Sequence, residues 1–272
     1  MIDRELSERE IGTNRVDREQ VFELWDELAA IPSAETDRAW RHLVSTIAGW
    51  IQSDMVYSVV NVRFLHGEDA ARDLLFGWRI KVITFLDPPP QPVQVAADRH
   101  VEHRVKDHGM TTIAAARGSG VFRVERLHAG FVDMDAFRKT EYYQTHFVAF
   151  GIHDQISVGC PISPEVELFY VFIRRELKTL YSEAEAELVG FALRGLSWMH
   201  RQLIYSHGLL VAQEPLTTTQ RDVLRLLLTD KTEKEIATEL GQSFHTTHTH
   251  VKDIFRKYNV KSRAGLMAVW LA

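Results

Sequence analysis

One stretch near the end of the chain, SFHTTHTHVKDIFRK (residues 243–257), restricts the fold most, because a helix would sort its side chains onto two unlike faces. At about 100° per residue, a stripe roughly 60° wide collects residues spaced three, four and seven positions apart. These residues are Thr247, Val251, Ile254 and Tyr258. Such spacing is typical of a helix edge that packs against a hydrophobic core.

The opposite face of this helix is polar. An arc of about 100° holds the side chains of His245, His248, Thr249, Lys252 and Arg256. No acidic residue of the helix falls within the arc, because Asp253 lies outside it. The three histidines cannot meet at one metal ion, since His250 points about 200° away from His248 and is expected to pack beside the apolar stripe. The polar face therefore suits a polyanion better than a metal.

Four helices are predicted after Pro215, and their connections indicate a helix-turn-helix. The expected ranges are 217–229, 232–240, 243–258 and 262–272. Thr232 and Glu235 have the spacing of a capping box, and Gly241 allows a sharp corner between the second and third helices. In a helix-turn-helix the second helix of the pair enters the major groove of DNA, so 243–258 is the expected recognition helix.

Residues 216–268, from LTTTQRDVL to RAGLMA, closely resemble the LuxR-type four-helix DNA-binding domain. The matches are spread along the whole stretch. They are Leu216-Thr217, Val223-Leu224, Lys234-Glu235-Ile236-Ala237, Leu240-Gly241, Ser243, Thr246, His250-Val251, Ile254, Lys257, Val260 and Ser262-Arg263-Ala264.

This resemblance implies roles for the side chains of the module. The residues that would face base edges are His248, Thr249 and Lys252, with Arg256 on the same face. The residues that would contact phosphates are Thr246, Lys257 and Lys234. The fourth helix would carry dimerisation through Leu266, Val269 and Trp270. A symmetric dimer would then read a two-fold-related operator.

Two positions depart from the family pattern. Thr247 stands where the family usually has Val, and its hydroxyl can bond a carbonyl one turn back. His248 stands where the family has Lys or Arg, so an imidazole replaces a permanent cation. The base preference at this position and the salt dependence of binding are therefore left open.

Charge is divided unevenly along the chain. It has 32 Lys/Arg and 37 Asp/Glu, a net charge of −5, yet residues 216–272 hold nine basic and six acidic side chains, a net of +3 against −8 elsewhere. This asymmetry is typical of a small basic module on a larger acidic domain. The single cysteine, Cys160, excludes an intrachain disulfide. Without a signal peptide or a membrane-length apolar run, the sequence predicts a cytoplasmic protein.

The larger part is predicted to be an α+β domain of the GAF/PAS-like type, an antiparallel sheet flanked by helices. Strands are expected at 55–65, 78–86, 121–127, 155–162 and 166–174. Helices are expected at 16–31, 34–52, 94–108, 135–149 and 182–207. The predicted domains are a GAF/PAS-like sensor or dimerisation domain at 1–210, a linker at 211–215 and the all-α LuxR-type domain at 216–272.

The stretch 134–196 resembles GAF-like sensory domains that precede LuxR-type modules, which implies a fold but no ligand. The residues predicted to line a pocket are Tyr57, Trp78, Tyr142 and Cys160. The alternative is that these aromatics are core residues and that the cysteine is an inert packing residue. The Tyr, Trp and Asp of acyl-homoserine-lactone sensors do not recur at matching spacing, so that ligand is not assigned.

Interpretations of the sequence as a metal-binding protein or an enzyme have weaker support. His100 and His103 can share a helical face with Asp107 one turn beyond, and His108 follows, but a solvated helix face is favoured. No nucleophile elbow, P-loop, metalloprotease or zinc pattern occurs in the sequence. We therefore predict no catalysis, no metal and no cofactor.

Taken together, these patterns predict an effector-responsive, DNA-binding transcriptional regulator. Its expected partners are double-stranded DNA, a second copy of the chain, a small-molecule effector and RNA polymerase, with no membrane. The alternative places the same DNA-binding module on a protein-docking or constitutive dimerisation domain that takes no small ligand. A DNA-tethered metalloenzyme is a third, less favoured alternative.

Overall fold

The computed structural model describes residues 18–102, 109–175, 179–212 and 214–271, and its centre is a five-stranded antiparallel sheet. The strands lie in the order β2-β1-β5-β4-β3. Their bounds are β1 Met55–Arg63, β2 Trp78–Phe85, β3 Arg123–Arg126, β4 Ile152–Ser163 and β5 Val166–Arg175. Each strand coincides with a range predicted from β-branched and aromatic residues, which confirms those predictions.

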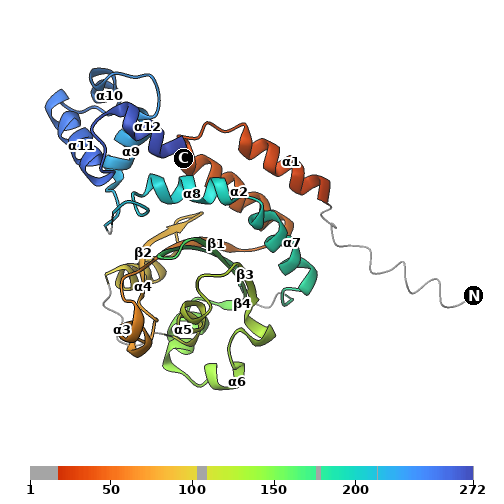
Figure 1. Cartoon of the computed structure of the whole chain (residues 1–272). Helices are drawn as coiled ribbons and strands as arrows, with labels where there is room; N and C mark the ends of the chain where they lie inside the picture. Colours follow the sequence, from red (N-terminus) through yellow and green to blue (C-terminus); the bar gives the residue numbers. More distant parts are fainter. Residues whose placement is uncertain (1–17, 103–108, 176–178, 213, 272) are drawn as a thin grey trace, which may run out of the picture.

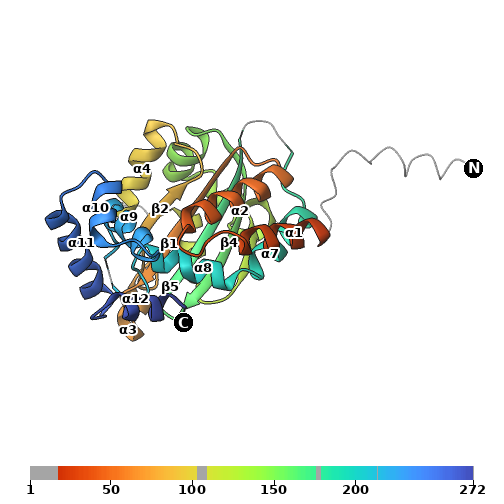
Figure 2. The ribbon, with the colours of Figure 1, turned by 90° about the horizontal axis from the view of Figure 1, so that it is seen from above.

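A layer of long helices covers one face of the sheet (Figures 1 and 2). It consists of α1 Arg18–Ala29, α2 Thr36–Trp50, α7 Glu183–Arg194 and α8 Ser197–Ser206. Side chains alternate across a strand. In β5 this alternation directs Leu168, Tyr170 and Phe172 towards the helical layer, where all three are fully buried. The main hydrophobic core therefore lies between the sheet and these helices.

Shorter helices cover the opposite face of the sheet (Figure 1). They are α3 Gly67–Arg72, α4 Gln91–Val101, α5 Met110–Arg117 and α6 Met134–Phe137, with two irregular helical segments, η1 Leu127–Phe131 and η2 Tyr143–Val148. Val59 of β1 and Phe169 and Val171 of β5 face this side. The predicted arrangement of an antiparallel sheet flanked by helices is confirmed, whereas its assignment to the GAF/PAS-like type stays a prediction.

The prediction of a single helix over 182–207 is wrong, because the helix is interrupted between α7 and α8. The Trp25 ring lies so close to Gly195 that an added Cβ would be 2.5 Å from it. The Trp25 indole also donates to the Ala192 carbonyl at 2.9 Å, the group that a continuous helix would offer to Leu196. The Leu196 amide bonds to the Leu193 carbonyl instead, which closes a tighter final turn.

Other helix predictions differ in extent. The helix predicted at 135–149 divides into α6 and η2, and the one predicted at 94–108 begins earlier, at Gln91. Residues 103–108 lie outside the described part of the chain. Helices α3 and α5 are not among the predicted elements, because both are short and lack a clear apolar period. Within the described residues, no helix is both long enough and apolar enough to cross a membrane.

The C-terminal helices form a smaller hydrophobic core of their own. They are α9 Thr218–Leu227, α10 Glu233–Glu239, α11 Phe244–Lys257 and α12 Arg263–Leu271, close to the predicted ranges. The predicted apolar edge of α11 is confirmed, since Thr247 and Ile254 are fully buried and Val251 is 2% exposed. The predicted capping box begins α10, and Gly241 turns the chain with a φ of +63°.

The C-terminal helices are docked directly on the larger part. Tyr205, near the end of α8, lies within the C-terminal core, and its carbonyl accepts a hydrogen bond from the Tyr258 hydroxyl. Two ion pairs join α9 to the beginning of α2, Arg221–Asp37 at 2.5 Å and Arg225–Glu35 at 3.2 Å. Exposed pairs of this kind contribute about 0–1 kcal/mol each. The shared core is therefore the stronger connection, and helix α8 contributes to both cores.

We expect the free energy of unfolding to fall as the pH is lowered from 6.5 towards about 3, because two buried histidines resist protonation. Burial lowers the pKa of His200 to about 3, and burial together with the Arg221 cation does the same for His207. Below pH 6.5 the unfolded chain binds these protons and the folded chain does not. Stability that is present at neutral pH is therefore lost on acidification.

Urea unfolding near pH 7 and near pH 5 measures this loss. His200→Gln is expected to show a smaller loss between the two conditions than the wild type. The exposed His66 provides the matched control, and His66→Gln should keep the full loss. An equal loss in His200→Gln and the wild type would contradict the assignment to this histidine.

Candidate nucleic-acid interface and ligand cavity

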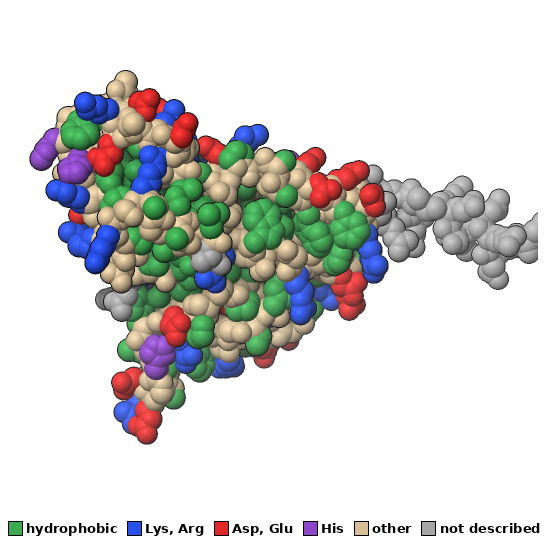
Figure 3. All heavy atoms as spheres, turned by 45° about the horizontal axis from the view of Figure 1, so that its top comes forward, with side chains coloured by type: hydrophobic (Ala, Val, Ile, Leu, Met, Phe, Trp, Pro, Cys, Tyr) green, Lys and Arg blue, Asp and Glu red, His purple; other side chains and the backbone are tan. Residues whose placement is uncertain are grey.

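Helix α11 presents its polar face to solvent at one end of the molecule, where Lys, Arg and His side chains gather (Figure 3). Ser243 caps the helix, and its hydroxyl accepts a hydrogen bond from the Thr246 amide at 3.0 Å. The exposed members of the predicted polar face are His245, Thr249, Lys252 and Arg256. The structure thus brings together the cations and hydroxyls that the helical spacing predicts.

His248 lies beside a carboxylate that a helical wheel cannot reveal. Glu233, at the beginning of α10, places its Oε2 atom 2.8 Å from Nδ1 of His248. The imidazole also stacks on Phe244, with ring centroids 5.8 Å apart. The arc of α11 itself holds no acidic residue, as the spacing predicts, but a neighbouring helix supplies one in the folded module. This carboxylate orients the imidazole and repels phosphate.

The predicted phosphate contacts divide into exposed and internal groups. Lys234 and Thr246 are exposed. The Lys257 amine instead donates to the Pro215 carbonyl at 2.9 Å and lies 3.4 Å from the side-chain oxygen of Gln220. This half-buried cation ties α11 to the beginning of α9, and its phosphate role stays a prediction.

The predicted dimer seam on α12 also needs correction. Leu266 is fully buried and Trp270 is 4% exposed, both within the core that the C-terminal helices form around Tyr205. Val269 packs against the same core and is half-buried. A helix that buries one side shows the same apolar spacing whether its partner is its own chain or another copy. The sequence pattern alone therefore could not separate the two cases.

The metal question concerns several histidines. Within the part of the chain that the structure describes, no group of three or more His, Cys, Asp or Glu side chains could hold a metal ion. Three of the residues considered from the sequence, His103, Asp107 and His108, lie outside the described residues. The fourth, His100, lines a cavity.

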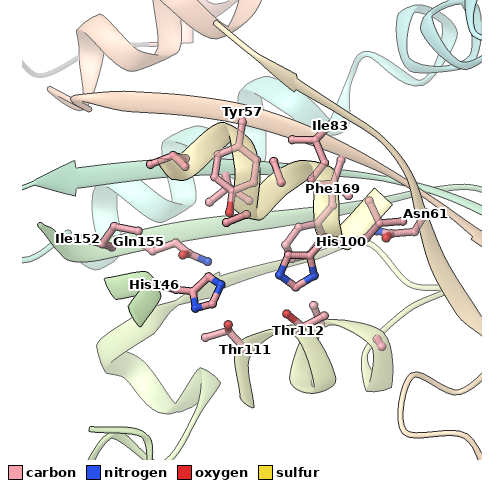
Figure 4. A pocket seen from close by; sticks show the side chains of 18 of the residues that line it. Tyr57, Asn61, Ile83, His100, Thr111, Thr112, His146, Ile152, Gln155 and Phe169 are labelled. Carbon is pink, nitrogen blue, oxygen red and sulfur yellow. The ribbon is translucent and has the colours of Figure 1, made fainter. Parts of the chain in front are cut away.

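That cavity, of about 170 Å³, lies between the sheet and the segments α4, α5 and η2 (Figure 4). Tyr57, Trp78 and Tyr142 line it as predicted. Cys160 does not, because it belongs to the core on the opposite face of the sheet. The alternation of β4 decides this: Gln155 faces the cavity, so a residue an odd number of positions away must face the other side.

The cavity is apolar over most of its wall and polar at one end. The apolar wall includes Val59, Leu75, Ile80, Ile83, Phe169 and Val171. Figure 4 shows the polar side chains that converge at the other end: Tyr57, His100, Thr111, Thr112, His146 and Gln155. Burial raises the pKa of the Tyr57 hydroxyl, with a further contribution from Tyr142, so this group stays protonated at neutral pH.

Sequence reasoning missed most of this polar end. Gln155 could have been found, because it alternates with the buried residues Ile156 and Val158 along β4. His146 lies in a segment predicted as a regular helix, and Thr111 and Thr112 lie in the unpredicted helix α5. No local pattern indicates that these segments meet above the sheet, since their contact depends on tertiary packing.

With this geometry in view, comparison with known proteins is decisive for the C-terminal helices. The family described as bacterial regulatory proteins, luxR family, matches residues 214–270. These residues are a LuxR-type helix-turn-helix domain. The match covers α9 to α12, including the recognition helix α11 and its polar face. The comparison therefore identifies α9 to α12 as a domain of a DNA-binding type.

Two curated relatives share the LuxR-type domain. Transcriptional regulatory protein MctR of Rhizobium johnstonii is 39% identical over 54 residues, which are 20% of this chain and 25% of that protein. Spore germination protein GerE of Bacillus subtilis is 45% identical over 49 residues, which are 18% of this chain and 66% of that protein. The chain thus spans a quarter of the first relative and just under two thirds of the second.

Solved structures with the larger part in common are remote. The VqsR LBD domain of Pseudomonas aeruginosa aligns at a TM-score of 0.46 and 16% identity, over 68% of this chain and 95% of that one. SdiA in complex with octanoyl-rac-glycerol aligns at a TM-score of 0.45 and 16% identity, over 90% of this chain and 91% of that one. Escherichia coli SdiA in another structure aligns at a TM-score of 0.42 and 14% identity, over 93% of this chain and 95% of that one.

We expect Glu233→Gln to tighten DNA binding, because it removes a negative charge 2.8 Å from His248 on the DNA-facing side. The gain should be on the order of 1 kcal/mol or less, since the pair is partly exposed. Fluorescence anisotropy with a labelled random-sequence duplex, at two salt concentrations, measures the affinity. Asp230→Asn makes the same charge change in the exposed loop before α10 and serves as the control. Weaker or unchanged binding by Glu233→Gln would contradict the repulsive role of this carboxylate.

Proposed function

We propose that this protein is a DNA-binding transcriptional regulator whose larger domain, residues 1–210, responds to a small-molecule effector. The observation that carries the proposal is a LuxR-type domain docked on a domain that holds a mostly apolar cavity with a polar end. Helix α11 would enter the major groove of a two-fold-related operator, and RNA polymerase would be the machinery under control. Neither part is proposed to carry out catalysis.

The exposed polar residues of the LuxR-type domain support the DNA-binding part of the proposal. Lys234, Lys252 and Arg256 provide cations that can neutralise phosphates. Thr249 and His248 stand on the same face and offer short polar groups to base edges. Arg256 pairs with Asp253 at 2.8 Å, yet its side chain is 78% exposed and its other N–H groups can still donate to a phosphate.

The cavity supports the sensory part. Ligand sites are concave, mostly apolar and furnished with a few convergent polar groups that fix orientation. The cavity beneath the sheet has this composition, since the polar side chains of Tyr57, His100, Thr111, Thr112, His146 and Gln155 converge in Figure 4, with Asn61 apart from them. The GAF/PAS-like type of the domain is part of the proposal. The alternative, a protein-docking domain without a small ligand, leaves this cavity without a role.

A continuous set of contacts connects the cavity with the LuxR-type domain. Phe169 and Val171 of β5 line the cavity, while Tyr170 between them packs on His200 of α8, with ring centroids 5.5 Å apart. The same helix places Tyr205 in the C-terminal core. A shift of β5 on ligand binding would therefore act on α8 and through it on the docked domain.

We also propose that the protein acts as a homodimer, and that the outer surface of α1, α7 and α8 forms the interface. Hydrophobic side chains are exposed over the helical layer (Figure 3). Phe22 and Phe191 are 42% and 39% exposed and pack on each other, and Trp198 of α8 is 40% exposed. An interface here would use aromatic residues that the chain's own core does not need, in place of the buried residues of α12.

Light scattering of the purified protein is expected to give twice the chain mass of 31.3 kDa. Trp198→Glu should lower the mass towards that of a single chain, because a charge would enter an apolar interface. Leu74→Glu, at a position that is 64% exposed on α3's side of the molecule, is the control and should leave the dimer intact. A monomeric wild type would overturn the dimer, and an intact Trp198→Glu dimer would overturn the interface.

A thermal-shift screen of the full-length protein against a metabolite library tests the effector, since a ligand that binds only the folded state raises the unfolding midpoint. Ala115 lines the cavity, so Ala115→Phe should fill it and abolish the shift. Ala184→Phe, on the exposed side of α7, should keep the shift. Anisotropy with a random-sequence duplex, with and without each hit, shows whether binding is coupled to DNA. The absence of any shift across the library would favour the protein-docking alternative.

A further inference from the structure

The polar part of the cavity lining contains no acidic side chain among the described residues. The polar lining residues are Tyr57, Asn61, His100, Thr111, Thr112, Ser119, Tyr142, His146 and Gln155, and each can both donate and accept a hydrogen bond. Since no carboxylate among them would balance a positive charge, a neutral or anionic head group fits this lining better than a cationic one.

The imidazoles of His100 and His146 lie at the centre of the polar end of the cavity (Figure 4). The rings of His100 and His146 are 6.1 Å apart between centroids and inclined at 70° (Figure 4). The His146 ring stacks on Tyr142 at 4.1 Å, and its Nδ1 atom lies 2.8 Å from the Thr145 hydroxyl. These contacts fix the orientation of the ring. Unlike threonine or glutamine, an imidazole can also gain a proton and carry a positive charge.

The remaining donors surround the two imidazoles from different elements. Figure 4 shows Thr111 and Thr112 of α5 beneath the rings, while the Tyr57 hydroxyl and the Gln155 amide reach in from β1 and β4. Because burial keeps Tyr57 protonated, its hydroxyl remains a donor at neutral pH. A buried anion is tolerated only when several hydrogen bonds and an opposite charge compensate its lost hydration. This end of the cavity offers several hydrogen bonds, and protonation of His100 or His146 would add the opposite charge.

We propose that the effector is a small amphiphilic carboxylic acid, with its carboxylate between His100 and His146 and its apolar tail against the sheet. The tail would lie on Val59, Phe169 and Val171, whose side chains form the apolar wall. The proposal rests on the sensory function proposed above and adds the chemical class of the ligand. A carboxylate has two acceptor oxygens, so it can engage both imidazoles at once, whereas an ester or a ketone offers weaker, uncharged acceptors.

The test compares head groups on one tail. Isothermal titration of the full-length protein uses octanoic acid, methyl octanoate and octylamine as probes. The acid is expected to bind about tenfold or more tightly than the ester, a difference of roughly 1.4 kcal/mol, and the amine is expected not to bind. Equal or tighter binding of the ester would overturn the proposal and leave a sensor for neutral ligands.

Two variants assign the preference to the imidazoles. His146→Gln and His100→Gln keep a donor but lose the ability to become charged, so each should bring the acid and the ester to similar affinity. His66→Gln, the same change at an exposed site, should keep the wild-type ratio. A full acid preference in both cavity variants would overturn the role of the histidines. The wild-type ratio still decides the ligand class if a cavity variant fails to fold.

The outcomes also separate this proposal from the sensory function itself. If the acid does not bind but another compound of the metabolite library shifts the unfolding midpoint of the wild type and not of Ala115→Phe, the ligand class is wrong and the sensor stands. If no compound produces such a shift, both proposals fail. If octylamine binds more tightly than octanoic acid, an acidic group lies at the site. This result would overturn the carboxylic acid as the ligand class and leave the sensory function standing.

Discussion

Strand β5 is buried on both faces along almost its whole length, and the larger domain is organised around it. Alternating side chains give this strand two hydrophobic surfaces, one under the long helices and one above the cavity. A central antiparallel strand of this kind reads as a continuous apolar run, VELFYVFI, and it requires cover on both sides. The cavity exists because the short helices on one side cover the sheet incompletely, whereas the long helices on the other pack against it.

Much of the positive charge of the LuxR-type domain is used within the chain. Arg221 and Arg225 pair with carboxylates at the beginning of α2, and Lys257 bonds to internal oxygens. Arg263 donates to the carbonyl of Leu227, the last residue of α9, and to that of Lys231 in the loop before α10. Few cations remain at the recognition face, so the docked domain offers less charge to DNA than its sequence suggests. Discrimination between sites then depends more on hydroxyls and the imidazole of His248.

The sequence predicted most of the fold, because the elements concerned are defined by local sequence patterns. The apolar edge of α11 needs only a period of 3.6 residues to be recognised, and the strands β1, β2, β4 and β5 need only their local enrichment in β-branched and aromatic residues. What it could not predict depends on neighbours far along the chain. The break at Gly195 requires the Trp25 ring, and the acidic group beside His248 requires α10 to lie against α11.

The candidate site shows the same division. Tyr57 and Trp78 could be predicted as pocket residues because aromatic side chains on a strand are either core or lining. The sequence misplaces Cys160, because only the register of β4, which turns Gln155 towards the cavity, shows that the cysteine faces the opposite core. His146 could not be anticipated, since it reaches the cavity from η2, an irregular segment without a regular apolar period. The sequence misassigns Leu266 and Trp270 to a dimer interface, because a helix has the same apolar spacing whether it packs on its own chain or on a second copy.

Tyr205 has a consequence for how the molecule comes apart. Its side chain belongs to the core of the LuxR-type domain although its helix belongs to the larger domain. Separating the two would expose that ring and remove a hydrogen bond to Tyr258, so neither part keeps its full core alone. The chain should therefore melt as one cooperative unit, and a ligand bound far away beneath the sheet would raise the melting temperature of the DNA-binding helices as well.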